Sequence, residues 1–214
     1  MESKKRKPGR PVGTAKSDEL LFLGRNQLRL FFDAVKKAGD TKYGLIFGLI
    51  LHLGLRVSEL TDLKLENISM GKKLEDWTIT INGKKHGKSR TYDSTELPAK
   101  LVKSLSGWIS GERGATDNPY VFPSRFCPDK PTKPQAVKNM FKRYLKAAGL
   151  PPRFSVHTLR ASCAVALIAE KNTSAAEIMR WLRLRTIQNA QVYFDRLQYK
   201  ETGAKVKRVF EGLF

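Results

Sequence analysis

With 214 residues, 41% of them hydrophobic and 28% charged, the chain can bury one sizeable core and has the composition of a globular protein. No apolar run approaches the roughly 18 residues that cross a bilayer, and two cysteines outside any C-x-x-C pattern, Cys127 and Cys163, argue against a disulfide scaffold or a zinc site. Forty lysines and arginines against twenty acidic residues give a formal net charge of +20, which indicates a polyanionic partner; without a lipidation motif or a basic amphipathic helix, nucleic acid is favoured over a membrane.

Residues 1–18 are polar, basic and interrupted by prolines and glycines, so we expect them to be disordered in the free protein. The segment from Lys7 to Pro11 is similar to an AT-hook, because prolines extend the chain and arginine is attracted to a narrow minor groove. An ordinary solvated basic tail or a nuclear localisation signal is the alternative. In either case the tail should add sequence-tolerant DNA affinity through Lys4, Lys5, Arg6, Lys7 and Arg10.

The next part of the chain, to about residue 194, has the pattern of a mainly α-helical domain with a small antiparallel sheet, either a hairpin or three strands. Apolar periodicity predicts helices over residues 28–38, 41–53 and 56–63. Alternating β-forming residues at 77–81 and 89–92 flank a Lys/Gly turn, which predicts a hairpin. Further helices are expected at 97–109, 135–148, 159–171 and 175–184, with a Gly- and Pro-rich loop at 111–133.

Three segments carry residues suited to chemistry: GLRVSEL at 54–60, GKKHGKSR at 83–90 between the two strands, and HTLR at 157–160 followed by QVY at 191–193. Each alone has an ordinary structural explanation, such as a surface arginine, a solvated turn, a structural histidine or a core tyrosine. In this order and at these separations they resemble the catalytic domain of the tyrosine recombinases, or phage integrases, from Leu20 to about Phe194.

The resemblance implies an enzyme that cuts and rejoins DNA, with Tyr193 as the nucleophile of a covalent 3′-phosphotyrosyl intermediate. Phosphoryl transfer needs positive charge around a pentacoordinate phosphate. Arg56 and Arg160 are expected to clamp the non-bridging oxygens, because a guanidinium fork matches phosphate geometry and stays charged. Religation would need no ATP, because the phosphotyrosyl link conserves the energy of the phosphodiester bond.

The remaining catalytic roles fall on an imidazole, a lysine and a carboxylate. His157 would assist proton transfer or hold the phosphate, since it shares a helix face with Arg160. The K-x-G-K-x-R turn favours Lys85 as the acid for the leaving 5′ oxygen, whereas counting from Gly83 favours Lys84. Glu59 matches the family's acidic position, which buttresses the active site; a surface salt bridge is the alternative. Two more hairpin residues are expected to bind DNA, namely Lys88 and Arg90.

One position departs from the family's pattern. The family normally carries His or Trp nine residues before the nucleophile, usually as Leu-Gly-His, and here Leu182-Arg183-Leu184 stands in that place. Leu184 cannot hydrogen-bond a phosphate, and loss of such a donor typically lowers the rate on the order of a hundredfold. Either Arg183 or Arg185 is a candidate for the missing contact, or the site is completed only on assembly.

The expected domains are the basic tail (1–18), the catalytic domain (19–194) and a C-terminal helix (195–214), without the extra DNA-clamping domain of full integrases. The C-terminal helix has an apolar stripe that either packs on its own domain or docks on a neighbouring protomer: Val206, Val209, Phe210, Leu213 and Phe214. Docking would give a homo-oligomer on double-stranded DNA, a tetramer in synapsis, and is compatible with accessory DNA-bending proteins. We expect no metal and no cofactor, because histidines and carboxylates lack ligand spacing.

Three hypotheses follow. The first is a site-specific recombinase or integrase. The second is a type IB topoisomerase-like enzyme, which shares the same catalytic residue types, although the GLRVSEL and HTLR forms favour the recombinase. The third is a non-catalytic DNA-binding protein that keeps the fold, for which Leu184 is the main support. The expected location is the cytoplasm and nucleoid for a prokaryotic or viral protein and the nucleus for a eukaryotic one.

Overall fold

The computed structural model describes residues 20–83, 89–114, 117–127, 129–170, 173–195 and 197. The predicted basic tail, the C-terminal apolar stripe and the hairpin lysines Lys84, Lys85 and Lys88 lie outside these residues, so the expectations about them stay predictions. Within the described ranges the chain is mainly α-helical with one small antiparallel sheet, which confirms the predicted fold class. None of the helices in these ranges is long and apolar enough to cross a membrane.

Helix α2 (Thr41–Leu53) is the central element, because its side chains are apolar on almost every face and such a helix is stable only when covered all round. Its most extensive contacts are with five other helices. These are α1 (Arg25–Lys37), α3 (Val57–Thr61), α4 (Ala99–Gly107), α5 (Pro134–Ala147) and α6 (Val156–Ala169). Where α1, α2 and α5 meet, the rings of Phe31, Phe47 and Phe141 pack at centroid distances of 5.3, 4.8 and 5.6 Å and form the centre of the core.

The sheet has three antiparallel strands in the order β1 (Ile68–Ser69), β2 (Thr78–Ile81), β3 (Arg90–Asp93). Ile79 pairs with Tyr92, and both side chains are buried, as period-2 alternation predicts for a sheet with one covered face. The three-stranded alternative is therefore correct. The last described pair of the hairpin joins Ile81 to Arg90, so the Lys/Gly turn follows β2 directly.

Several helix boundaries differ from the prediction by two or three residues, and two of them have a clear local cause. Helix α6 begins at Val156 and not at Leu159, because Ser155 stands at its N-cap and its N–H donates to Thr158 Oγ1 at 3.0 Å. Helix α7 (Ala175–Trp181) ends before residue 184, because the chain enters the left-handed region at Arg183, with φ 52°. A further helical stretch, residues 187–195, was not predicted and carries Tyr193.

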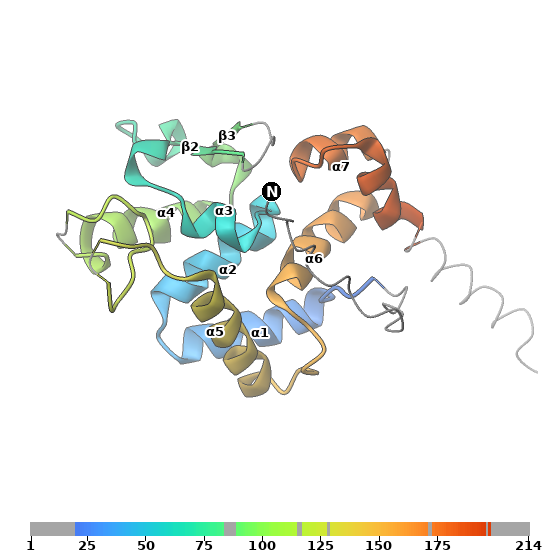
Figure 1. The fold of residues 1–214 in the computed structure, drawn as a ribbon, viewed down its shortest axis with the longest axis horizontal. Coiled ribbons are helices and arrows are strands. Elements are labelled where there is room, and N and C mark those ends of the chain that lie inside the picture. Colours follow the sequence, from blue (N-terminus) through green and yellow to red (C-terminus); the bar gives the residue numbers. More distant parts are fainter. Residues whose placement is uncertain are drawn as a thin grey trace, which may run out of the picture.

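Figure 1 shows the sheet and α7 on the same side of the helical layer formed by α1, α2 and α5, with α6 running from that layer toward α7. This arrangement brings the turn after α2, the first turns of α6 and the segment after α7 together, although they are far apart in sequence. Of the three predicted chemical segments, residues 54–60 and residues 157–160 with 191–193 meet at this place, whereas residues 84–88 of the hairpin turn lie outside the described residues.

Candidate active site

Gly54 ends α2 in the left-handed conformation, with φ 57° and ψ 36°, which favours glycine. A Cβ atom at this position would lie 2.3 Å from Leu182 Cδ2, so any other residue here would have to displace the buried Leu182 side chain. The turn places Arg56 at the N-cap of α3, with its backbone extended. Its side chain is 45% exposed and accessible to a ligand.

Glu59, in the first turn of α3, holds Arg56 at two points. Its Oε2 accepts the backbone N–H of Arg56 at 2.8 Å, and its Oε1 accepts from Arg56 Nη1 at 2.6 Å. The Glu59 side chain is only 2% exposed, so the alternative of a surface salt bridge is wrong. A buried carboxylate fixes both the backbone and the guanidinium of the predicted phosphate-binding arginine.

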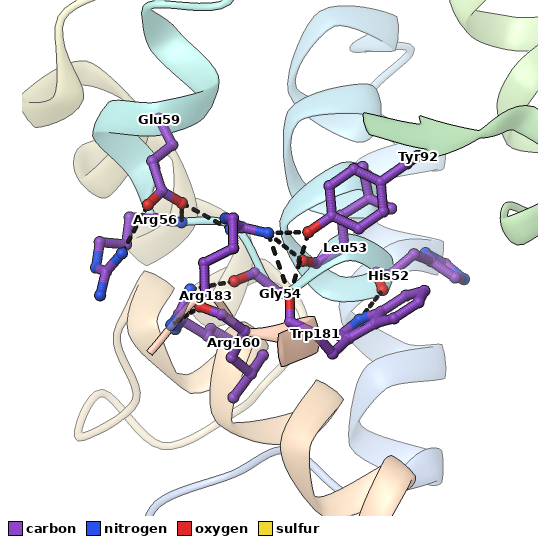
Figure 2. A network of polar contacts seen from close by, with 10 residues as sticks. His52, Leu53, Gly54, Arg56, Glu59, Tyr92, Arg160, Trp181 and Arg183 are labelled. Atoms are coloured by element: carbon purple, nitrogen blue, oxygen red, sulfur yellow. Dashed lines mark hydrogen bonds and ion pairs between the residues drawn. The ribbon is translucent and has the colours of Figure 1, made fainter. Parts of the chain in front are cut away.

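Glu59 has a second cationic partner, since Arg183 Nη2 donates to its Oε2 at 2.8 Å. Burial by itself raises the pKa of Glu59, but the charge of Arg183 and the hydrogen bonds from Arg56 and Arg183 outweigh it and hold the pKa below its ordinary value. The carboxylate is therefore ionised at neutral pH. Figure 2 shows it between the two guanidinium groups.

Arg160 lies in the second turn of α6 and is buried. Its Nη1 donates to the carbonyl of Gly54 and its Nη2 to the carbonyl of Leu182 at 2.5 Å, so this one side chain joins the turn after α2 to the end of α7 (Figure 2). Burial and the charge of Arg56 lower the pKa of Arg160, yet an arginine remains protonated at neutral pH. A fixed cation stands at the centre of the site.

Tyr193 lies next to this cation within the same protomer. Its phenol is near enough to the Arg160 guanidinium to be among the groups, with Glu59, that oppose the lowering of the Arg160 pKa by burial. The ring packs on a second apolar cluster that joins α6 to the segment after α7 and includes Cys163, Ile178, Leu182 and Ala190. Residues predicted to be nucleophile and clamp are therefore brought together.

His157 stands in the first turn of α6, close enough to three cations to feel their charge. Although the residue is exposed to solvent, partial desolvation by its neighbours lowers its pKa most, and the charges of Lys138, Arg160 and Arg56 lower it further. The imidazole is therefore neutral at pH 7, when it can accept a proton. Lys138, on α5, was missed by sequence reasoning, because an exposed lysine on an amphipathic helix carries no signal of what faces it.

The structure corrects the expectation that Arg183 offers a direct phosphate contact. Its side chain is 4% exposed, and its Nη atoms donate to Glu59, to the Tyr92 hydroxyl and to the carbonyl of Trp181. Leu184 is half-buried in the same cluster as Tyr193.

Arg185 is exposed and lines a pocket of about 840 Å³ between β3 and α7. Arg90 lines it too, with its guanidinium stacked on Tyr92 and Trp181 at 4.5 and 4.4 Å and paired with Glu96 at 3.2 Å. In the described ranges no group of three or more His, Cys, Asp or Glu side chains could hold a metal ion.

Comparisons with known proteins identify the family. The model of the phage integrase family matches residues 22–199. The tyrosine recombinase XerA of Pyrococcus furiosus is 31% identical over 165 residues, which cover 77% of this chain and 53% of that protein. The chain thus spans about half the length of the curated relatives it matches.

Solved structures share the fold. The XerH recombinase bound to its difH substrate in a pre-cleavage complex has a TM-score of 0.68 at 21% identity, over 86% of this chain and 52% of that one. A lambda integrase tetramer bound to a Holliday junction has a TM-score of 0.62 at 18% identity, over 84% and 49%. The chain belongs to the phage integrase family and has the catalytic-domain fold of the tyrosine recombinases.

Proposed function

We propose that this chain is a site-specific DNA recombinase that breaks and rejoins strands through a 3′-phosphotyrosyl link to Tyr193. The observation that carries the proposal is the position of the Tyr193 phenol near the buried guanidinium of Arg160, which is also near enough to Arg56 to feel its charge. A phenol adjacent to two fixed cations suits attack on a phosphodiester, because those cations stabilise the charge that develops on the phosphate.

In the proposed reaction the Tyr193 oxygen attacks phosphorus, the bond to the 5′ oxygen breaks and the bond to the phenol oxygen forms. His157, neutral at pH 7, accepts the phenol proton. A hairpin lysine, Lys85 or Lys84, donates a proton to the leaving 5′ oxygen; both follow β2 in sequence. The reverse reaction with a new 5′-hydroxyl completes strand exchange, and the number of phosphoester bonds does not change.

The proposed partners are double-stranded DNA and further copies of the chain. The net charge of +20 supports the first. XerH, with the same fold, is bound to its difH substrate, and the lambda integrase is a tetramer on a Holliday junction. By analogy, four protomers would act on two duplexes. Leu184, in place of the family's donor, predicts slower chemistry than in a recombinase that has this donor.

A non-catalytic DNA-binding protein is the second candidate, and Leu184 is the observation that favours it. The test is a library of nicked duplexes with randomised sequence, from which covalent protein–DNA complexes are trapped under denaturing conditions and sequenced. The recombinase predicts covalent product that disappears in Tyr193→Phe and persists in Tyr120→Phe, which removes a phenol from the loop 117–127. DNA binding without any covalent product would support the non-catalytic DNA-binding protein. Supercoil relaxation by monomers without strand exchange would indicate a topoisomerase instead.

A further inference from the structure

Arg183 occupies a conformation and an environment that disfavour arginine. Its φ of 52° lies in the left-handed region, where a side chain is strained. Its side chain is buried, and its Nε–H has no hydrogen-bond partner among the residues that the structure describes. A buried donor without a partner is unfavourable. The family's pattern has glycine at this place, which would avoid both penalties.

Several elements meet at the Arg183 guanidinium (Figure 2). Nη2 donates to Glu59 Oε2 of α3 at 2.8 Å, and Nη1 donates to the Tyr92 hydroxyl of β3. Nη1 also lies 3.2 Å from the carbonyl of Trp181, at the end of α7, and 3.5 Å from that of Leu53, at the end of α2. A side chain of smaller reach could not join these elements.

The consequence for the site passes through Glu59. Its two oxygens are shared between Arg56 and Arg183, and Oε2 serves both. Without Arg183, this buried carboxylate would keep one partly exposed partner, and it could turn away from Arg56 or become protonated. Arg56 itself has a long, half-exposed side chain, so its orientation depends on the carboxylate.

We propose that Arg183 is a positioning residue for DNA cleavage, which holds the Glu59 carboxylate in the orientation that fixes Arg56 at the phosphate. The inference rests on the proposed function. It also gives a reason for an arginine in a backbone conformation that favours glycine. The Arg183 side chain points inward to Glu59, which binds Arg56, and does not take the place of the donor that Leu184 replaces.

The test is single-turnover cleavage of a nicked duplex selected as above, with the rate constant, the end point and the DNA affinity measured separately. Arg183→Met should lower the rate constant by between about tenfold and a hundredfold, because misplaced catalytic groups have effects of this size, with little change in DNA affinity. Arg183→Lys, which keeps a charge opposite Glu59 without the planar fork, should lie between Arg183→Met and wild type.

The pathway is tested with a double-mutant cycle. If Arg183 acts through Glu59, Arg183→Met combined with Glu59→Gln should be no slower than Glu59→Gln alone. If Arg183→Met fails to fold, Arg183→Gly is the second variant, because it removes the guanidinium and also relieves the strain of the left-handed backbone. The same loss of cleavage rate is expected from it.

Arg113→Met is the matched control, since Arg113 donates to the carbonyls of Tyr120 and Asn118 outside the site. A purely structural effect reduces the fraction of active molecules and therefore the end point, whereas misplacement of Arg56 reduces the rate constant. Arg113→Met should leave the rate constant unchanged.

A wild-type rate constant in Arg183→Gly or Arg183→Met, or additive losses in the cycle, would overturn the inference. Absence of covalent product from the wild type would overturn the proposed function instead.

Discussion

Gly54 and Leu182 are in contact, and their two carbonyl groups accept hydrogen bonds from the same guanidinium, that of Arg160. The contact joins the turn that presents Arg56 to the segment that leads to Tyr193. The positions of Arg56 and Tyr193 relative to each other therefore depend on this contact and on the Arg160 bridge.

Gly54→Ala should lower the free energy of unfolding by roughly 2–4 kcal/mol, from left-handed strain and overpacking against Leu182. Urea unfolding at constant m-value measures this change. Gly39→Ala is the control, because Gly39 also has a positive φ, 65°, but a Cβ there would meet nothing within 4 Å. It should show the strain alone, about 1 kcal/mol. Equal losses in the two variants would contradict the contact.

Arg160→Lys should lower the cleavage rate on the order of a hundredfold or more, because an ammonium cannot bridge two carbonyls and still face the phosphate as a fork. Single-turnover cleavage measures the effect. Arg25→Lys, a substitution on the exposed side of α1, should cleave like the wild type. An unchanged rate in Arg160→Lys would be incompatible with a bidentate role.

The pKa of His157 should lie below its ordinary value of about 6.5, because partial desolvation and the charges of Lys138, Arg160 and Arg56 disfavour the imidazolium. A folded-state pKa below the unfolded one means that the unfolded chain binds the proton more strongly. This group's stabilising contribution is therefore complete above about pH 6.5 and decreases as the pH falls toward the folded-state pKa. An NMR titration of the free protein measures the value directly.

The same titration tests the cause. Lys138→Met removes one of the three charges and should raise the His157 pKa, which would move the acidic limb of the cleavage profile to higher pH. Lys146→Met, on the same helix α5, should leave both unchanged. A His157 pKa at or above the ordinary value in the wild type would refute the proposed environment.

Leu184→His restores the side chain that the family's pattern has before the nucleophile. We expect faster cleavage, by about tenfold or more, because a donor facing the developing phosphate charge is worth at least that much. Leu184→Met keeps the site apolar and should show no gain. If histidine and methionine behave alike, residue 184 does not face the phosphate in the complex.

The basic tail should contribute to DNA affinity and not to the chemistry. Observed affinity should fall with salt with a log–log slope of about 0.9 per neutralised phosphate. Removal of residues 1–18 should make this slope shallower and leave the single-turnover rate unchanged at saturating protein. The AT-hook interpretation further predicts a greater loss on A·T-rich than on G·C-rich DNA; equal losses would leave an ordinary basic tail.

Periodicity was sufficient to predict most of the fold. Helix α2 is apolar on nearly every face, which is typical of a central helix. In β2, apolar and polar residues alternate, which is typical of a strand with one buried face, so local patterns identify both elements. Boundaries were less predictable: the start of α6 depends on a hydrogen bond between Ser155 and Thr158, and the end of α7 depends on the left-handed Arg183.

By itself the sequence determined the family and the residue types of the candidate site, because the motifs around Arg56, Arg160 and Tyr193 are local strings of residues at set separations. Only the tertiary structure decided which groups Glu59 and Arg183 contact. Sequence spacing does not distinguish a surface ion pair from a buried one at Glu59. Both charges are buried where the segment after α7 meets the end of α2 and α3. Burial and long-range pairing depend on the whole chain, so no local pattern carries them.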